Sequence, residues 1–410
     1  MRPVLTDAWV QRKLGEILAE KISNGIMNRA GRNELNIKHI NVVNLYSPSH
    51  IRIDELEYID ATENDLKRCN VEIGDIFLTR SSLKVEGIAQ ANILLDEGSF
   101  VFDDHIMRIK LTDNFEPFFV KEALNHSPTK KQFMTKSKTG TMTTIGQDDI
   151  ATSTLSFPIE AEQTAIGNFF RTLDDTITLH KRKLDGLKDM KKAYLQQMFP
   201  QAGERVPRVR FAGFTGEWQE RKLGEMVEKQ KSYSLSRDVE TVEVTGYRYI
   251  HYGDIHRKRA DIIVSDEQLP SIRANEYATL NQGDLVLADA SEDYTGIAEP
   301  CVITHKPKEN IVAGLHTIAI RPVDSDSLYL YYLFHTDAFK KYGNHVGAGL
   351  KVFGITFNNL AKFETCFPEF SEQTAIGSLF HNLDKQIDNQ NQKVDQLKQL
   401  KTAYLQKMFV

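Results

Sequence analysis

A tandem repeat is the feature that most constrains the fold of this 410-residue chain. Glu162–Phe199 and Glu372–Phe409 share 21 identical residues in 38 positions at a constant offset of 210, where background frequencies would give about two or three. Weaker matches continue upstream, since Trp9–Glu16 is similar to Trp218–Glu225 at an offset of 209. The sequence therefore predicts two copies of one unit, each with a variable part of about 150 residues and a constant tail of about 40.

The variable part of each repeat has the pattern of a mixed α and β domain. In the first repeat, short apolar runs separated by Gly, Asp and Ser predict strands over 75–79, 87–95 and 105–111. A helix is expected over 117–134, opened by Pro117, with a counterpart over about 327–342. A stretch rich in Gly, Pro and Arg follows the first tail and predicts a linker.

The constant tails carry a heptad pattern, which is typical of helices packed in a coiled coil. A helix of 38 residues would be about 57 Å long. The first seam consists of Leu173, Ile177, His180, Leu184, Leu187, Lys191, Tyr194 and Met198, and the second of Leu383, Ile387, Gln390, Val394, Leu397, Lys401, Tyr404 and Met408. Both seams are polar at the same two layers. This match favours a packed pair of fixed register over two unrelated amphipathic surface helices.

Few catalytic signatures occur in the chain. It has no GxxxxGK[ST], GxSxG or HExxH motif, and no Asn-Pro-Pro-Tyr or Asp-Pro-Pro-Phe segment of the kind that holds a flipped adenine in amino-methyltransferases. His251 and His256 lie five apart on a strand-like stretch, which favours surface groups over metal ligands. Asp103-Asp104-His105 could form a catalytic cluster, but the counterpart Gly314-Leu315-His316 lacks both acids. We interpret the triplet as turn and strand-start residues.

The charge distribution matters more than the total. A net charge of −5 excludes a uniformly basic nucleic-acid coat, yet residues 121–140 have a net charge of +4. In the second repeat Arg248 and the run Arg257-Lys258-Arg259 lie among tyrosines and histidines, which predicts a cation-rich, aromatic-interleaved strand pair. Acids concentrate in 54–75 and 261–300. A solvated mixed-charge surface explains any one patch, but the same layout in both repeats favours a DNA-binding face.

The composition sets the expected compartment. Hydrophobic residues make up 41% and charged residues 26%, as in soluble globular proteins. The sequence contains no run of 18 apolar residues, so no membrane span is predicted. The first residues lack the apolar core of a signal peptide. Cys69, Cys301 and Cys366 are too far apart for a disulfide framework or a zinc ribbon. We expect a reduced, cytoplasmic protein without a bound metal.

Four short motifs, in the same order in both repeats, point to a family. They are Trp-x-x-x-Lys-Leu-Gly-Glu, Gly-Asp followed by apolar residues, Phe-Pro-x-x-x-Glu-Gln, and Tyr-Leu-Gln-x-Met-Phe. The chain resembles the specificity subunit of type I restriction–modification enzymes over nearly its whole length. One departure is that the lead-in Pro207–Gly216 precedes only the second repeat.

The resemblance implies an α+β fold of two tandem mixed α/β target-recognition domains, separated by two long antiparallel coiled-coil helices that form a pseudo-two-fold repeat. The expected boundaries are 1–158 and 218–368 for the target-recognition domains, 159–200 and 369–410 for the spacer helices, and 201–217 for the linker. Because the variable parts differ more than the tails, we expect two half-sites of different sequence.

The resemblance also implies a non-catalytic subunit. Each target-recognition domain would read one half of a bipartite double-stranded DNA target, and the helices would dock two methyltransferase subunits and set the gap. Two motor-nuclease subunits would complete the complex. No cofactor is expected on this chain, since AdoMet, ATP and Mg would be bound by the partner subunits. No membrane partner is expected.

Loop and strand-end polar residues are the candidate DNA contacts. In the first repeat they are Arg80, Ser81, Ser82, Lys84, Lys136, Lys138, Thr139, Thr141 and Thr143, and in the second Tyr249, His251, Arg257, Lys258, Arg259, Ser291, Asn344, His345 and Lys351.

Two other functions stay open at this point. A scaffold could hold other subunits on a coiled coil without touching DNA, and a DNA-binding measurement would distinguish it. A DNA enzyme with its own nuclease or methyltransferase site is disfavoured by the missing motifs.

Overall fold

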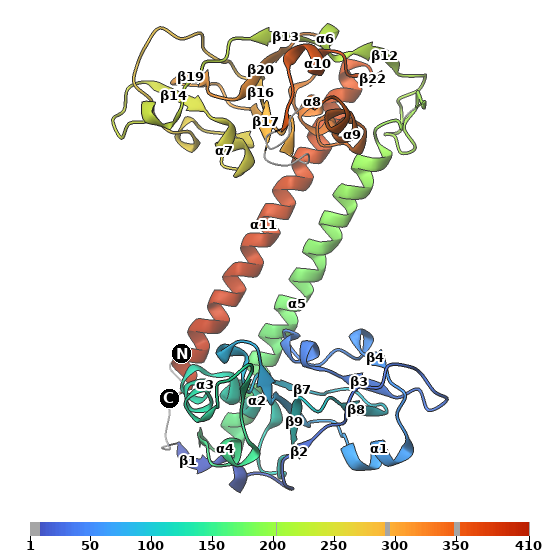
Figure 1. Ribbon diagram of the computed structural model, residues 1–410, viewed down its shortest axis with the longest axis vertical. Coiled ribbons are helices and arrows are strands. Elements are labelled where there is room, and N and C mark those ends of the chain that lie inside the picture. The colour runs from blue at the N-terminus through green and yellow to red at the C-terminus, as the bar shows by residue number, and fades with distance from the viewer. Residues whose placement is uncertain (1–8, 202, 292–295, 348–352, 410) are drawn as a thin grey trace. The chain divides into compact units, whose positions relative to one another are not determined.

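A computed structural model describes residues 9–201, 203–291, 296–347 and 353–409. The chain divides into two compact units (Figure 1). Unit 1 comprises Met1–Lys183 and Gln390–Val410, and unit 2 comprises Leu184–Asn389. The helices α5 (Glu160–Gln197) and α11 (Phe370–Met408) each contribute one segment to each unit.

Unit 1 is built from short strands and short helices. A four-stranded sheet has the order β2-β9-β5-β7, a three-stranded sheet has the order β4-β3-β8, and β1 pairs with β11 and β6 with β10. The strands are β1 (Val10–Lys13), β2 (Ser23–Asn24), β3 (Lys38–Ile40), β4 (Glu57–Tyr58), β5 (Ile76–Thr79), β6 (Ser81–Ser82), β7 (Ala91–Ile93), β8 (Phe100–Phe102), β9 (Ile106–Ile109), β10 (Thr143–Thr144) and β11 (Thr154–Phe157). The helices are α1 (Glu63–Cys69), α2 (Pro117–Asn125), α3 (Ser127–Lys136) and α4 (Gln147–Ala151), with the first part of α5 and the last part of α11.

Unit 2 repeats this plan. A five-stranded sheet has the order β13-β20-β16-β18-β15, and the two-stranded pairs are β12-β22, β14-β19 and β17-β21. The strands are β12 (Gln219–Lys222), β13 (Val227–Gln230), β14 (Tyr247–Ile250), β15 (Ile262–Ile263), β16 (Leu285–Ala288), β17 (Ala290–Ser291), β18 (Pro300–Ile303), β19 (Asn310–Ala313), β20 (Thr317–Pro322), β21 (Phe353–Gly354) and β22 (Glu364–Phe367). The helices are α6 (Leu223–Met226), α7 (Tyr252–His256), α8 (Ser327–Leu333), α9 (Asp337–Val346) and α10 (Phe357–Ala361), with the last part of α5 and the first part of α11.

The strand pairing confirms the predicted duplication. The antiparallel pair β1-β11 has its counterpart in β12-β22, and the parallel pair β3-β8 in β14-β19. The three strands predicted in the first repeat are observed as β5, β7 and β9. The predicted α+β class, with long helices in the tails, is confirmed.

One predicted helix is wrong in its extent. The stretch 117–134 forms two helices, α2 and α3, that meet at His126, whose backbone is extended. Pro128, in the first turn of α3, lacks an N–H donor and restricts the backbone before it, so it starts a helix more readily than it continues one. In the second repeat α8 and α9 replace the predicted 327–342 helix, and Thr336 caps α9 with its side chain.

The Phe-Pro-x-x-x-Glu-Gln motif has a structural explanation in both units. In unit 1 the Gln163 side chain donates to the Pro158 carbonyl at 3.0 Å and accepts from the Glu116 N–H at 3.3 Å. In unit 2 Gln373 donates to the Pro368 carbonyl at 3.0 Å and accepts from the Asp326 N–H at 3.0 Å. The glutamine therefore joins the start of each long helix to the start of the helix that covers the sheet.

The glycine that follows this motif is required by close packing. A Cβ atom at Gly377 would lie 2.8 Å from the Tyr329 nitrogen and 2.9 Å from Asp326 Oδ1, and one at Gly167 would overlap the Glu116 carboxylate. Because these neighbours cap and begin α8 and α2, any larger residue would push the covering helix away from the long helix.

The long helices pair in opposite directions within each unit. In unit 1 Phe169 contacts Tyr404 with ring centroids 5.0 Å apart, and Leu173 and Ile177 pack with Leu397. In unit 2 Leu184, Leu187, Leu383 and Ile387 join one apolar cluster. Contacts made by later residues of α5 are thus made with earlier residues of α11, as expected for an antiparallel pair.

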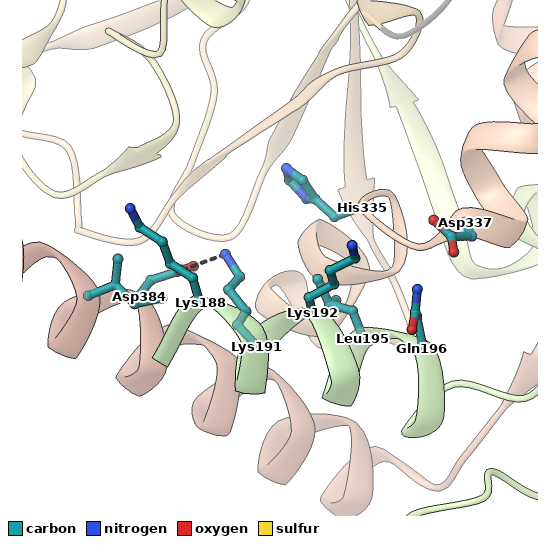
Figure 2. A pocket seen from close by; sticks show the side chains of 9 residues that line it. Lys188, Lys191, Lys192, Leu195, Gln196, His335, Asp337 and Asp384 are labelled. Carbon is teal, nitrogen blue, oxygen red and sulfur yellow. Dashed lines mark hydrogen bonds and ion pairs between the residues drawn. The ribbon is translucent and has the colours of Figure 1, made fainter. Parts of the chain in front are cut away.

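The predicted seam positions are mostly buried. Relative exposure is below 10% at the apolar positions Leu173, Ile177, Leu184, Leu187, Met198, Leu383, Ile387, Val394 and Leu397, and also at Gln390. His180, Lys191, Tyr194, Lys401 and Met408 are half-buried and Tyr404 is exposed. The polar members are paired: Gln390 bonds to His180, and Lys191 lies 2.5 Å from Asp384 Oδ1 (Figure 2).

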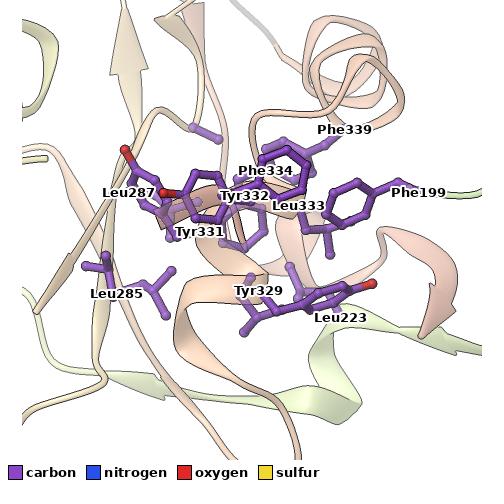
Figure 3. Close-up of a cluster of buried hydrophobic side chains, with 14 of the residues drawn as sticks. Phe199, Leu223, Leu285, Leu287, Tyr329, Tyr331, Tyr332, Leu333, Phe334 and Phe339 are labelled. Carbon is purple, nitrogen blue, oxygen red and sulfur yellow. The ribbon is translucent and has the colours of Figure 1, made fainter. Parts of the chain in front are cut away.

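The last residue of the Tyr-Leu-Gln-x-Met-Phe motif completes a core in each unit. Phe409 stacks on Phe119 at 5.2 Å and meets Trp9 at 6.0 Å in unit 1. Phe199 lies 5.4 Å from Tyr329 in the core of unit 2 (Figure 3). Each core therefore takes its final aromatic side chain from the end of a long helix that begins beside the other core.

Within the described residues, no helix combines the length and the apolar character needed to cross a membrane. Cys69, Cys301 and Cys366 are free thiols, all of them buried.

Candidate nucleic-acid interface

A short two-stranded ribbon brings together the two candidate segments of the first repeat. Strand β6 pairs antiparallel with β10, with Ser82 opposite Thr143. Lys138 extends this pairing, because its main chain exchanges hydrogen bonds of 2.8 and 2.9 Å with Thr144. Residues 80–84 and 138–144, which are far apart in sequence, therefore form one surface.

The backbone beneath Arg80 is held firmly. The Arg80 N–H donates to the His105 carbonyl at 2.7 Å, and the Arg80 carbonyl accepts from the Ile145 N–H at 3.0 Å. The Arg80 and Lys84 side chains are exposed. A fixed backbone with exposed cationic ends suits recognition of phosphates or guanine edges.

The other candidates of the first repeat differ in access. Lys138, Thr139 and Thr141 are exposed, whereas Ser81 and Thr143 are buried at 8% and 6% exposure. Lys136 donates three hydrogen bonds of 2.9 to 3.2 Å, to the Asp149 carbonyl and the hydroxyls of Thr152 and Ser153. The Lys136 ammonium thus caps the C-terminal end of α4.

The predicted basic stretch 121–140 is not one surface patch. Lys121 is 3% exposed and lies 2.5 Å from Glu122 and 3.2 Å from Asp174. Lys130 donates to the Ile88 carbonyl at 3.1 Å, and burial lowers its pKa to about 8. The net charge of a sequence window does not reveal which of its charges are neutralised inside the fold.

Apolar side chains that the sequence reasoning missed accompany the ribbon. Leu83 is 84% exposed and Tyr46 53%, and both line a pocket of about 640 Å³ with Met142, Ser82 and Lys84. Exposed apolar groups beside cationic ones can contact base methyl groups. The sequence signal for this surface is Leu83, an apolar residue that stands between Ser82 and Lys84 in the segment joining the predicted strands 75–79 and 87–95.

Unit 2 has the equivalent ribbon. β17 pairs antiparallel with β21, with Ser291 opposite Phe353, where unit 1 pairs Ser82 with Thr143. Ser291 is 7% exposed. Phe353 was not predicted, although the repeat offset of 210 aligns it with Thr143.

The predicted aromatic strand pair of the second repeat is wrong beyond residue 250. Only Tyr247–Ile250 is a strand, and the next residues form α7, which His251 caps by accepting from the Gly253 N–H at 3.1 Å. Tyr249 is fully buried and donates to Glu240 at 2.8 Å. Burial and this carboxylate raise the pKa of Tyr249. His251, expected at the surface, is 6% exposed, and burial lowers its pKa.

The cations of this region are partly neutralised. Arg248 lies 2.9 Å from Glu309, and Lys258 lies 2.6 Å from Glu299. Arg257 and Arg259 are exposed, and Arg259 lies 3.8 Å from the buried Asp254. Asn344 and His345 are exposed on α9. Lys351 lies outside the described residues.

One cluster offers metal-ligating atoms. The side chains of Asp103, Asp104 and His105 place a ligand atom each within 4.8 Å of one another, next to the carbonyl that fixes Arg80. No other such group occurs where the chain is described.

A known protein family matches the chain once in each repeat. The sequence profile described as "Type I restriction modification DNA specificity domain" matches residues 6–189 and 215–399, once in each repeat. No curated protein sequence matches the chain.

Solved structures match over the full length. The crystal structure of the type I restriction–modification system S subunit from M. genitalium aligns with a TM-score of 0.59 at 12% identity, covering 100% of this chain and 98% of that one. A chain from a study of complex assembly and conformational transition of the type I R-M system aligns with a TM-score of 0.51 at 15% identity, covering 98% of each chain. At these identities the likeness shows a common fold. Because the profile covers both repeats and well over half of the residues, this chain belongs to the family of type I restriction–modification specificity subunits.

Proposed function

We propose that this chain is the sequence-specific DNA-binding subunit of a type I restriction–modification complex, and that each unit reads one half of a bipartite target. The observation that carries the proposal is the ribbon that recurs at equivalent positions, β6-β10 in unit 1 and β17-β21 in unit 2. A two-stranded ribbon fits the major groove of B-DNA, and exposed cations flank the first one.

The chemistry of the first ribbon supports direct reading of bases. Arg80 can make a bidentate contact with a guanine edge. Lys84 and Lys138 can neutralise phosphates on either side and set the register. Leu83 offers an apolar surface to a thymine methyl group.

The second ribbon supports a different half-site. A phenylalanine, Phe353, stands where the first ribbon has Thr143, and the exposed arginines lie after α7 instead of on the ribbon. Because base readout depends on side-chain chemistry at these positions, we infer that the two halves of the target differ in sequence.

The long helices supply a docking face for methyltransferase subunits. Met190 and Leu400 occupy equivalent positions of the two repeats, one in each unit, and are 42% and 43% exposed. Exposed apolar side chains at matched positions suit one partner per unit, and therefore two methyltransferase subunits. The length of the helices sets the number of unread bases between the half-sites.

The chemistry belongs to the partners in this proposal. The methyltransferase subunits bind AdoMet and flip the target adenine, and two motor-nuclease subunits use ATP and Mg. The specificity subunit contributes position and sequence, and takes no catalytic step itself.

The test is a genome-wide map of N6-methyladenine in the source organism, with and without the gene for this chain. We expect one split motif to lose methylation when the gene is removed. In the same background, DNA binding by the chain assembled with its methyltransferase subunits should be specific for that motif. Assembled complexes that bind all DNA equally would refute the proposal and favour a scaffold.

A further inference from the structure

Unit 2 carries an acid at the position where unit 1 carries its exposed arginine. Arg80 immediately precedes β6, and Asp289 immediately precedes β17. The Arg80 N–H donates to the His105 carbonyl at 2.7 Å, and the Asp289 N–H donates to the His316 carbonyl at 3.0 Å. The main chain therefore holds the two residues in the same way.

A second pair of hydrogen bonds supports this correspondence. The Ile145 N–H, directly after β10, donates to the Arg80 carbonyl at 3.0 Å. The Ile355 N–H, directly after β21, donates to the Asp289 carbonyl at 2.8 Å. Because each peptide is fixed by both strands of its ribbon, the two side chains start from equivalent points of the fold and differ in their chemistry.

Both side chains lie beside the turn that follows the parallel strand pair of their unit. Arg80 Nη1 lies 3.5 Å from the carbonyl oxygen of Asp104 in unit 1. In unit 2 Asp289 Oδ1 lies 3.2 Å from His316 Nδ1, and the turn 314–316 itself contains no acid. The acidic group of this region thus belongs to the turn in unit 1 and to the end of the ribbon in unit 2.

The Asp289 carboxylate is placed to accept a further hydrogen bond. Its side chain is 30% exposed, so part of the group faces solvent. Burial raises the pKa of Asp289, and the neighbouring His316 offsets only part of that effect. An additional donor would therefore stabilise the charged form of this carboxyl.

DNA offers few donors to such a group. Phosphate oxygens are negatively charged acceptors and repel a carboxylate. In the major groove the donors are the N4 amino group of cytosine and the N6 amino group of adenine. An acid that contacts a base edge therefore selects these bases, whereas an arginine at the same place selects guanine.

We propose that Asp289 is a specificity-determining residue of unit 2, and that its carboxylate accepts a hydrogen bond from the exocyclic amino group of a cytosine or an adenine in the half-site. This inference rests on the proposed function, in which the ribbons read the DNA. It also predicts how the half-sites differ, with guanine read by Arg80 and an amino-bearing base read by Asp289.

The experiment uses the full chain assembled with its methyltransferase subunits, and DNA libraries randomised in one half-site at a time. Sequencing of the bound DNA gives the base preference at each position. Asp289→Ala should weaken a preference for cytosine or adenine about tenfold at one position of one half-site, and leave the other half-site unchanged. Asp289→Arg should replace that preference by one for guanine, a gain that misfolding cannot produce. Glu276→Ala, at an exposed acid of the same unit, is the control and should keep every preference.

Base analogues identify the group that is read. Replacing cytosine by 2-pyrimidinone, or adenine by purine, removes only the amino group. At the affected position this removal should weaken binding by the parent complex about tenfold. It should have no effect on binding by Asp289→Ala, because both changes remove the same contact. The analogue that gives this result shows whether the base is cytosine or adenine.

The possible failures are distinct. Circular dichroism checks that each variant is folded. A sequence-specific complex whose preferences are unchanged in folded Asp289→Ala would overturn this inference and leave the proposed function standing. Tighter binding of this variant to all DNA, with unchanged preferences, would also overturn it, since Asp289 would then only repel phosphates. A parent complex that binds all DNA equally would refute the proposed function and this inference together.

Discussion

Lys401 Nζ lies 2.8 Å from the carboxylate of Asp174, and the equivalent residues of the other repeat, Lys191 and Asp384, form the same ion pair in unit 2. The surroundings differ. In unit 1 the pair joins Lys121 and Glu122, which are almost fully buried, to make a network of two ammonium groups and two carboxylates.

The second repeat has tyrosines in place of that additional ion pair. At the positions of Lys121 and Glu122 it carries Tyr331 and Tyr332, and the Tyr332 hydroxyl donates to Asp384 at 2.7 Å. The long helices therefore contact the covering helix through an ion-pair network in unit 1 and through a tyrosine hydroxyl in unit 2.

Removing the lysine should affect the two units unequally. Lys401→Met leaves two buried carboxylates with one ammonium, and should lower the free energy of unfolding by about 3 to 5 kcal/mol. Lys191→Met leaves Asp384 with the Tyr332 hydroxyl and some solvent, and should cost about 1 kcal/mol. Urea unfolding followed by circular dichroism measures both variants. Equal losses would contradict the network.

Removing the aromatic side chain that follows a long helix should destabilise the core of one unit. Phe409→Ala removes a ring that is 6% exposed and stacked on Phe119, and should cost about 3 to 5 kcal/mol. Phe199→Ala is the matched variant in unit 2 and should cost a similar amount, since Phe199 is 4% exposed. Limited proteolysis should then cut unit 1 in the first variant and unit 2 in the second. Cleavage of both units in either variant would argue against separate cores.

Acid should weaken unit 2 through Glu299. Burial raises the pKa of this carboxyl, but His335, Lys340 and Lys258 lower it by more, so it lies well below the ordinary value. A carboxyl whose pKa is lower in the folded than in the unfolded chain stabilises the fold at pH values above its unfolded pKa, about 4.3 for Glu. This contribution to the free energy of unfolding is lost as the pH falls towards the folded-state pKa. Glu299→Gln should cost about 3 kcal/mol at pH 7.

The difference between Glu299→Gln and the parent chain should therefore shrink as the pH falls from 6 to about 3. Thermal unfolding across this interval measures it. Glu276→Gln, at an exposed position of the same unit, is the control and should follow the parent at every pH. A constant difference would mean that Glu299 does not titrate as described.

Arg80→Ala should relax or abolish recognition of one half-site and leave assembly with the methyltransferase subunits intact. Loss of one bidentate contact corresponds to about 1 to 3 kcal/mol, or roughly 5- to 150-fold in specificity. Methylation of DNA libraries randomised at each half-site provides the measurement, with Arg12→Ala on β1 as an exposed control. An unchanged sequence preference would remove Arg80 from the reading surface.

The spacing proposal can be tested with inserted residues. One heptad added to a single tail should disrupt assembly or change the gap, because the seams no longer match. One heptad added to both tails should lengthen the helices by about 10.5 Å and the gap by about three base pairs. Four residues added to both should disrupt the seams. Methylation maps report each result, and an unchanged gap in the double-heptad variant would exclude the helices as the spacer.

The repeat and the heptads predicted much of the architecture, because both are patterns of local spacing. Leu173 and Leu397 were recognised as seam residues from such spacing, and they do pack together. The break at His126 was missed, although Pro128 marked it. The burial of Lys121 was missed for a different reason, since one of its network partners, Lys401, is 280 residues away in sequence.

The candidate interface was predicted less completely. Ser82 and Thr143 were proposed separately, and only the fold shows that they are opposite each other. Tyr249 and His251 looked like surface groups because aromatic residues among cations resemble a binding strand. Their burial depends on the hydrogen bond from Tyr249 to Glu240 and on the position of His251 at the start of α7, and no local sequence pattern predicts either feature.

The placement of Phe409 has a consequence for the order of synthesis. Most of unit 1 is made first, but its core lacks the ring that stacks on Phe119 until Phe409, which follows all of unit 2 in the chain, has been synthesised. Unit 2 has no such delay, since Phe199 precedes its own sheet. The unit whose synthesis starts first is therefore completed second, and a nascent chain stopped between unit 2 and Phe409 would have one complete core and one incomplete core.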